Sequence, residues 1–153
     1  MINIRGFIKT KISGKRPSAG RSIEITDGTK RKNLEKARRG ENIARKYLRD
    51  RGYRIIDQNY RTRYAEIDLV AEDKGTLVFV EVRTRGHERF GTPEETINKN
   101  KIRKLIRNAR GYLSCKAYNK PYRIDAVCIV LGEYKEPERI SHYKNITYYF
   151  MEN

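Results

Sequence analysis

AEIDLVAEDKGTLVFVEVR, residues 65–83, is the stretch of sequence that decides the fold. The alternation of polar and apolar residues from Glu66 to Ala71 predicts one β-strand, and the apolar run from Leu77 to Val82 predicts a second. The residues between them, Glu72 to Thr76, are typical of a tight turn. We therefore predict a β-hairpin.

Acidic and basic side chains share one face of this hairpin, because side chains on a strand alternate between its faces. Glu66 and Asp68 share a face of the first strand, and Glu81 and Arg83 share a face of the second. A turn at Lys74-Gly75, or a four-residue loop over Asp73 to Thr76, places Asp68 opposite Glu81 and Glu66 opposite Arg83. A three-residue loop would shift the register by one residue and separate these pairs.

Asp68 and Glu81, if they are opposed, predict a cation between them. Directly opposed Cβ atoms lie roughly 4.5–5.5 Å apart, and like charges at that separation repel. Mg²⁺ prefers oxygen ligands and is typically held by one or two carboxylates together with water and substrate phosphate. The alternative is a solvated strand face whose acids pair with some of the many Lys and Arg residues. Spacing alone leaves both interpretations open.

The charge of the chain narrows the class of partner. The chain has 153 residues, a formal net charge of +16 and a pI near 10.0, which fits one basic domain. A strong positive excess is expected of a nucleic-acid-binding protein, because much of its affinity comes from neutralising phosphates. An anionic membrane surface and an acidic protein partner are the alternatives on charge alone.

Apolar runs and cysteines indicate the compartment. The longest apolar run is Ala126 to Leu131, far short of the roughly 20 residues of a membrane helix, and basic residues interrupt the N-terminus. The two cysteines, Cys115 and Cys128, have no metal-ligand spacing. Cys128 lies in an apolar run, which predicts a buried thiol in a reducing compartment. We expect a cytoplasmic protein.

Residues 1–32 differ from the rest of the chain. They contain nine basic and two acidic residues and show no sustained hydrophobic period. Such a segment is expected to be a disordered basic N-terminal arm, followed by one folded domain over residues 33–153. The arm either adds nonspecific phosphate contacts or is a tail without function.

A helical period begins at Asn33 and ends at Arg51-Gly52. Its stripe contains Leu34, Ala37, Glu41, Ala44 and Leu48. A carboxylate inside an apolar stripe needs a partner or a function, because burying it unpaired is costly. Glu41 either pairs with Arg38 or Arg45 at the edge of the stripe, or is a third acid directed at the hairpin.

A second helix is predicted after the hairpin. Thr92 is expected as its N-cap, with Pro93 at the first helical position and Glu95 completing a capping box. Its buried face comprises Ile97, Ile102, Leu105, Ile106, Ala109, Tyr112 and Leu113. Its other face is basic and is either a phosphate-binding surface or a solvated one. The basic residues are Lys99, Lys101, Arg103, Lys104, Arg107 and Arg110.

Further strands are predicted over Tyr53 to Ile56, Arg123 to Leu131 and Ile146 to Phe150. The order of helices and strands indicates an α/β domain in which helices flank a mixed sheet.

Several ordered motifs between about residues 35 and 131 resemble the YraN family of bacterial proteins. They include Gly40-Glu41-x-x-Ala44, Glu66-Ile67-Asp68-Leu69-Val70-Ala71, Val78-Phe79-Val80-Glu81-Val82-Arg83-x-Arg85, Phe90-Gly91-x-Pro93 and Arg123-x-Asp125-x-Val127. That family is thought to adopt the restriction-endonuclease-like fold of Holliday-junction resolvases. The resemblance therefore implies a restriction-endonuclease-like mixed central sheet flanked by helices.

The resemblance also implies a metal-dependent nuclease site of the D…ExK type. Asp68 and Glu81 would be metal ligands for Mg²⁺ or Mn²⁺, Glu41 an additional acid, and position 83 the residue of the base type. Nucleases of this superfamily place Lys where this chain has Arg83. Lys can orient or deprotonate the attacking water, whereas Arg stays protonated and can only orient it or stabilise negative charge.

The expected function is hydrolysis of DNA phosphodiesters, with branched or structured DNA among the possible substrates. Arg85 and basic residues of the second helix would hold the nucleic acid, namely Lys99, Lys101, Arg103, Lys104 and Arg107. A binding module without turnover and a basic adaptor for an acidic partner are the alternatives. The resemblance to resolvases also makes a homodimer an expectation.

Overall fold

The computed structural model describes residues 27–62, 65–86 and 91–148. Along the chain the elements are α2 (Asp27–Arg49), β1 (Arg54–Arg61), β2 (Glu66–Asp73), β3 (Thr76–Arg85), the 3₁₀ helix η2 (Glu94–Thr96), α3 (Lys99–Cys115), β4 (Tyr122–Leu131) and β5 (Pro137–Tyr143). No helix in the described part of the chain is long and apolar enough to cross a membrane.

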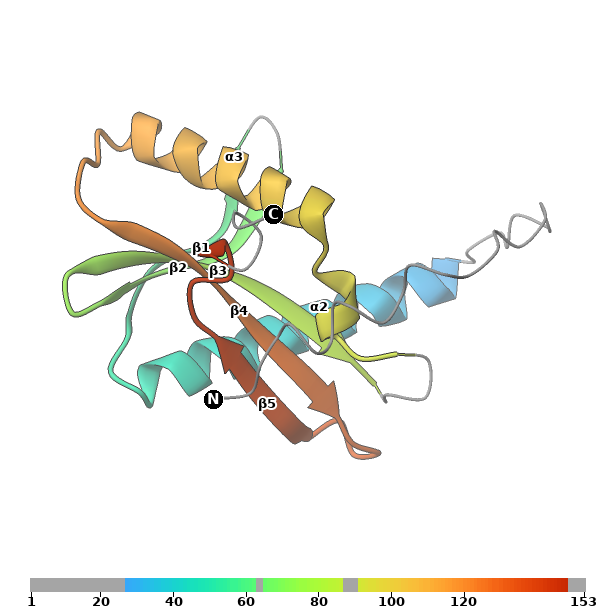
Figure 1. Cartoon of the computed structure of the whole chain (residues 1–153). Coiled ribbons are helices and arrows are strands. Elements are labelled where there is room, and N and C mark those ends of the chain that lie inside the picture. Colours follow the sequence, from blue (N-terminus) through green and yellow to red (C-terminus); the bar gives the residue numbers. More distant parts are fainter. Residues whose placement is uncertain (1–26, 63–64, 87–90, 149–153) are drawn as a thin grey trace.

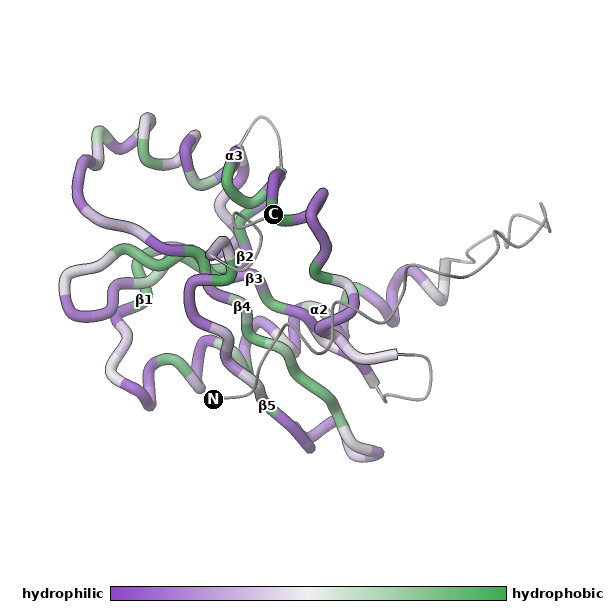
Figure 2. The backbone as a smooth tube through the Cα atoms, in the orientation of Figure 1, coloured by the Kyte–Doolittle hydropathy of each residue, from purple (hydrophilic) through white to green (hydrophobic). Residues whose placement is uncertain are grey.

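One five-stranded mixed sheet forms the centre of the molecule. Its strands lie in the order β1-β2-β3-β4-β5, and only β3 and β4 are parallel. Figure 1 shows α3 above the sheet and α2 below it. The central strands are hydrophobic over most of their length in Figure 2, because both of their faces are covered. The predicted α/β architecture, a mixed sheet flanked by helices, is confirmed.

Each helix covers its own apolar cluster. Ile102, Leu105, Ala109 and Tyr112 of α3 pack on one face of the sheet. Ala44 and Leu48 of α2 pack on the other face, against a cluster that includes Leu69, Val80 and Ile129. Alternate residues of β2, β3 and β4 therefore belong to different cores.

The hairpin adopts one of the two registers that the sequence left open. Lys74 and Gly75 have φ values of 50° and 82°, as a two-residue hairpin turn requires. The β2–β3 ladder runs from Asp73↔Thr76 to Leu69↔Val80. The turn therefore sets the register that directs Asp68 towards Glu81.

The first helix begins earlier than predicted. α2 starts at Asp27 rather than Asn33, so residues 27–32, which the sequence assigned to the arm, are helical. The side chains of residues 28–35 are exposed, and Arg31 pairs with Glu35 one helical turn later at 3.2 Å. Hydrophobic periodicity could not reveal this extension, because the extension buries no apolar face. Residues 1–26 of the predicted arm lie outside the described residues.

The predicted start of the second helix is wrong. Pro93 is the N-cap residue of the short helix η2, and no side chain caps that helix. α3 begins only at Lys99. Asn98 is the N-cap of α3, where its side chain accepts a hydrogen bond from Lys101 N at 3.0 Å. Glu94 is buried and binds Arg139 and the Tyr143 hydroxyl. This tertiary contact fixes η2 as a separate turn.

The predicted last strand is also misplaced. β5 is Pro137–Tyr143, whereas residues 146 and 147 form a turn and residues 149–150 lie outside the described residues. Ile146 is buried in the α3-side core and donates its N–H to the carbonyl of Ile124. The apolar Ile146 is therefore a core residue, but it does not belong to a strand.

Candidate functional site

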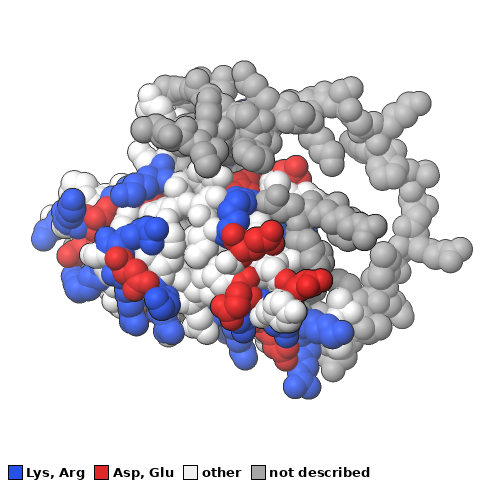
Figure 3. Space-filling view, turned by 90° about the horizontal axis from the view of Figure 1, so that it is seen from below, with Lys and Arg blue, Asp and Glu red and all other residues white. Residues whose placement is uncertain are grey.

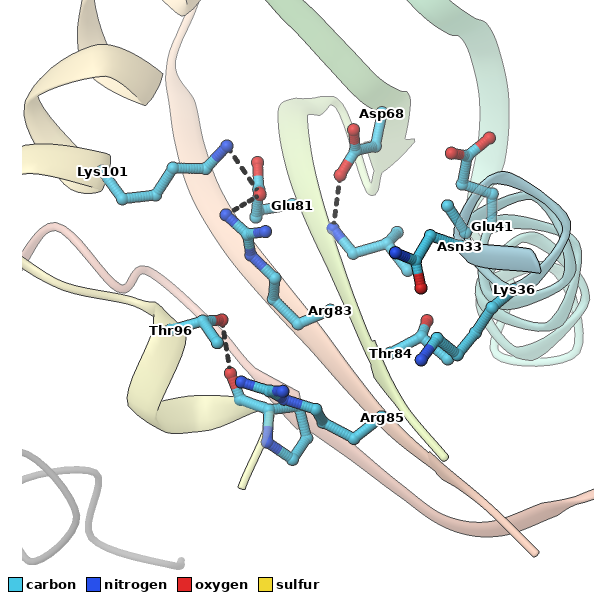
Figure 4. A pocket seen from close by; sticks show the side chains of 13 residues that line it. Asn33, Lys36, Glu41, Asp68, Glu81, Arg83, Thr84, Arg85, Thr96 and Lys101 are labelled. Carbon is cyan, nitrogen blue, oxygen red and sulfur yellow. Dashed lines mark hydrogen bonds and ion pairs between the residues drawn. The ribbon is translucent and has the colours of Figure 1, made fainter. Parts of the chain in front are cut away.

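A hollow opens where β2 and β3 separate. The β2–β3 ladder ends at Leu69↔Val80, while the start of β2 continues to pair with β1. Beyond this point the backbone N–H of Val82 donates to the side chain of Asp68, at Oδ2 and 2.8 Å, and not to the backbone of β2. The fork leaves a cavity of about 370 Å³ between α2, the two strands and the start of α3 (Figure 4). We call it the acid pocket.

The acid pocket brings together all four predicted catalytic residues and Arg85. Glu41, Asp68, Glu81, Arg83 and Arg85 all line it. One part of the prediction is wrong, because Glu66 does not face Arg83. Glu66 is instead paired with Arg61 of β1, with their charged atoms 3.5 Å apart. β2 turns towards β1 at this point, so its first residue lies away from the hollow.

Glu81 is the most deeply buried acid of the pocket, with 2% of its side chain exposed. Its Oε1 atom binds Arg83 Nη2 and Lys101 Nζ, each at 2.8 Å. Its Oε2 atom and Arg83 Nε are buried without a hydrogen-bond partner among the described residues. A carboxylate with one bare oxygen and two cations on the other is suited to an additional ligand.

Asp68 carries a strongly perturbed carboxyl group. Its pKa is raised to about 7, mainly because the group is buried and secondly because the charge of Glu81 is nearby. The hydrogen bond from Val82 N and the charge of Lys101 act in the opposite direction, while Glu41 adds repulsion. These acids are therefore close enough to repel one another.

Glu41 reaches the pocket because α2 packs unusually closely on β3. A Cβ atom added to Gly40 would overlap Thr84 Oγ1 and lie 3.0 Å from Thr84 Cβ. The alternative partner Arg45 binds Asn42 and Gln58 instead. No ion pair of Glu41 is found within the described ranges, so its placement matches the third-acid interpretation.

Lys101 has a place in this site that the sequence did not predict. It was grouped with the phosphate-binding residues of the second helix, but its ammonium group lies on the Glu81 carboxylate. The Asn98 cap fixes the first turn of α3 beside the fork. The signal available in the sequence was the missing Lys at position 83, which called for a lysine from another element.

The acid pocket has a cationic end. Figure 4 shows Lys36 of α2 beside Thr84, and Arg85 of β3 beside Thr96, away from Asp68 and Glu81. Both cations line the cavity. The predicted role of Arg85 in holding a phosphate therefore remains geometrically reasonable, and Lys36 joins it.

The other predicted phosphate-binding residues divide into two groups. Arg103 and Arg107 line a separate groove between α3 and the end of β1. Lys99 and Lys104 are exposed on α3 and line neither hollow. The basic face of the second helix thus serves two different hollows.

The donor set of the acid pocket fits a divalent cation with two protein ligands. Among the described residues, no group of three or more His, Cys, Asp or Glu is arranged to hold a metal ion. Glu41 is therefore not a third ligand in this arrangement. Asp68 and the bare Oε2 of Glu81 provide the one or two carboxylates that Mg²⁺ or Mn²⁺ uses beside substrate phosphate.

Comparison with known proteins supports the sequence-based resemblance. A family model described as "Uncharacterised protein family UPF0102" matches residues 40–129. The chain belongs to the UPF0102 family. This is the YraN family, so the resemblance is confirmed. The matched range contains Glu41, Asp68, Glu81 and Lys101, whereas Lys36 precedes it.

Individual UPF0102 proteins are similar over most of their length. A UPF0102 protein of Persephonella marina is 47% identical over 96 residues, which are 62% of this chain and 83% of that protein. A relative from Syntrophomonas wolfei is 42% identical over 69% of this chain and 91% of its own length. A relative from Thermodesulfovibrio yellowstonii is 35% identical over 73% and 95%, respectively.

Proposed function

We propose that this UPF0102 protein is a divalent-metal-dependent endonuclease that hydrolyses DNA phosphodiester bonds. The observation that carries the proposal is the convergence of Asp68 and Glu81 at the β2–β3 fork, in a protein of net charge +16. A cation bound by these carboxylates would mediate between them and a phosphate substrate.

Asp68 and Glu81 would hold the metal ion, through Asp68 and the bare Oε2 of Glu81. A bound divalent ion would supply Lewis-acid chemistry, which polarises the scissile phosphodiester and makes nearby water more acidic. Because Val82 N–H already fixes one oxygen of Asp68 at 2.8 Å, the orientation of that carboxylate is set before any ligand binds.

Lys101 and Arg83 would together take the roles that a single lysine at position 83 was expected to have. Lys101 can orient the attacking water and release a proton at Nζ, whereas Arg83 stays protonated and neutralises charge developing on the phosphate. Both groups already meet at Glu81 Oε1. The Arg at position 83 therefore does not remove the only amine from the site.

Glu41 would accept or donate a proton and would not bind the metal ion. It lines the same hollow but belongs to no metal-binding group among the described residues. Lys36 and Arg85 at the cationic end would hold a phosphate next to the scissile one, which would fix the strand across the fork.

Cleavage assays on linear, nicked, flapped and four-way DNA with Mg²⁺ or Mn²⁺ test the proposal. We expect cleavage that disappears on chelation and in the variants Asp68→Ala and Glu81→Ala. The matched control is Glu72→Gln, on the same strand as Asp68 but paired with Arg54 at the surface, which should cleave normally. Full activity of both pocket variants would refute the site assignment.

A nucleic-acid-binding module without turnover is the second candidate. The observation that favours it is the pairing of Glu81 Oε1 with two cations, which lowers the need for a metal ion. A binding module would show affinity that falls steeply with salt, no metal dependence, and no cleavage of any of these substrates. Association with DNA is common to both candidates.

A further inference from the structure

A second hollow lies between the end of β1 and the outer side of α3. Its volume is about 930 Å³. It is lined by Tyr60, Arg61, Thr62, Arg103, Ile106, Arg107, Arg110, Gly111, Ser114 and Cys115. We call it the β1–α3 groove. None of its lining residues lines the acid pocket.

The rim of the groove is uniformly positive. Arg103, Arg107 and Arg110 follow one another at spacings of four and three residues, so they lie along one side of α3. Arg61 stands on the β1 side, and its contact with Glu66 is a solvent-exposed pair. No Asp or Glu occurs among the described residues that line the groove.

This arrangement is not a general property of the basic surface. Figure 3 shows the face of the molecule opposite α3, where Lys and Arg are interspersed with Asp and Glu. Ion pairs elsewhere on the surface include Lys46 with Asp50 and Arg54 with Glu72. The groove therefore concentrates positive charge at one place.

The floor of the groove is apolar and aromatic. Ile106 and Gly111 belong to it, together with the half-buried ring of Tyr60. The Tyr60 ring packs edge-on against Tyr112, with centroids 4.7 Å apart and an interplanar angle of 74°. Tyr112 in turn packs against Phe79 in the core, which holds Tyr60 in a fixed orientation. A rigid aromatic ring beneath a positive rim is suited to a stacked base.

α3 connects the groove with the acid pocket. Its first turn carries Lys101 to Glu81, and the arginines of the groove follow on the same helix. Arg110 lies nine positions after Lys101, which corresponds to about 13 Å along the helix axis and a rotation of about 180°. A strand that joins the two hollows must therefore cross from one side of α3 to the other.

We propose that the β1–α3 groove binds a single-stranded DNA segment that continues from the strand held in the acid pocket. That this segment continues from a strand in the acid pocket rests on the proposed nuclease function. The substrate class is therefore DNA with an unpaired arm next to the cleavage point, such as a flap or a tailed duplex.

A single strand fits the groove better than a duplex does. Proteins that bind single strands combine a positive groove for the backbone with aromatic side chains on which bases stack. A duplex keeps its bases stacked inside, so its backbone would meet the arginines while Tyr60 found no base. Exposed bases of a single strand would cover the apolar floor.

Equilibrium binding in EDTA tests the proposal without hydrolysis. Fluorescence anisotropy would compare a blunt hairpin duplex with the same hairpin carrying a ten-nucleotide dT tail. We expect the full-length protein to prefer the tailed hairpin. In Arg103→Gln/Arg107→Gln/Arg110→Gln, affinity for the tailed hairpin should fall at least tenfold, and its salt slope should decrease by about 2.

The matched control removes three charges elsewhere. Lys46→Gln/Arg49→Gln/Arg54→Gln changes the net charge equally, at the opposite end of β1 and on α2. This variant should keep the preference for the tail. Equal losses in both triple variants, or equal losses for blunt and tailed hairpins, would overturn the proposal in favour of nonspecific or duplex binding.

Tyr60 provides an independent readout. Tyr60→Leu keeps an apolar contact with Tyr112 but removes the stacking ring, so affinity for the tailed hairpin should fall about tenfold while the melting temperature changes little. Tyr60→Phe should bind as the wild type does. Unchanged binding by Tyr60→Leu would refute stacking.

The same titrations in Asp68→Asn separate this proposal from the proposed function. The preference for the tail should persist there, because Asp68 does not line the groove. A protein that never cleaves DNA but prefers the tail would refute the nuclease proposal and support the groove, and cleavage without this preference would do the reverse.

Discussion

At the scale of single residues, Glu81 is the centre of the site. It is almost fully buried, and the two cations that contact it come from different elements: Arg83 from its own strand and Lys101 from α3. A buried carboxylate needs such partners, because leaving the charge unpaired costs several kcal/mol. The same contacts place Lys101 beside the acids.

Substitution of Lys101 should separate a catalytic lysine from a merely charged one. Lys101→Met is expected to lower kcat by about 100-fold or more, because it removes the amine from the fork. Arg83→Lys should retain activity and shift the pH–rate profile to lower pH, since Lys can lose a proton. The measurement is cleavage kinetics from pH 6 to pH 9.

A comparison of binding and folding accompanies this experiment. Both variants should bind DNA in EDTA within a few-fold of the wild type and should melt cooperatively. Normal kcat in Lys101→Met would show that Lys101 only balances the charge of Glu81.

At the scale of elements, the contact between α2 and β3 positions Glu41. Gly40 lies directly over Thr84, so the helix approaches the strand more closely than a side chain would allow. The next residue of the helix is Glu41, which therefore enters the pocket edge. The separation of β2 from β3 and the close packing of α2 create the site together.

Gly40→Ala should move α2 away from β3. We expect a loss of about 1–3 kcal/mol in the free energy of unfolding, because the added methyl group overpacks a tight contact. This loss outweighs the gain of roughly 1 kcal/mol in helix propensity. Chemical denaturation would measure it, and cleavage would fall through displacement of Glu41.

Gly28→Ala is the matched control on the same helix. A Cβ added at Gly28 meets nothing within 4 Å, so this variant should be as stable as the wild type or slightly more stable. A Gly40→Ala variant that behaved like Gly28→Ala would contradict the close contact.

At the scale of the whole molecule, the acid pocket makes stability depend on pH. The pKa of Asp68 is raised from 3.8 to about 7, first by burial and then by Glu81. The folded protein therefore binds a proton more tightly than the unfolded chain. Its contribution to stability is complete below about pH 4 and is lost as pH rises through about 7.

Asp68→Asn should remove this pH dependence. Without metal and above pH 7, the free energy of unfolding of the variant should exceed that of the wild type by on the order of 1–3 kcal/mol, because Asn is neutral at every pH. The pKa values of Asp73 and Glu94 are lowered in the folded protein, so these groups change the free energy of unfolding only in acid. They do not affect its pH dependence between pH 5 and pH 8. Denaturation curves across this window provide the measurement.

Added Mg²⁺ or Mn²⁺ should restore the stability of the wild type above pH 7 and leave Asp68→Asn unchanged. This readout needs no DNA and no cleavage. An Asp68→Asn variant whose stability followed the same pH curve as the wild type would show that Asp68 is not the group that titrates.

The sequence by itself determined the hairpin and limited its register to two alternatives. The turn Lys74-Gly75 takes positive φ angles that a two-residue loop requires, and alternation then fixes which face each side chain occupies. These signals are local, so a single sequence contains them. The acids of the fork, the α/β class and the family were accessible for the same reason.

Only the tertiary structure decided where separate elements meet. The pairing of Lys101 with Glu81, the early start of α2, the cap at Asn98 and the position of β5 were not foreseen. None of them leaves a periodic signal, because each depends on which surfaces pack together across many residues of sequence. The packing of α2 and α3 on opposite faces of the sheet therefore adds Glu41 and Lys101 to the two carboxylates of the fork.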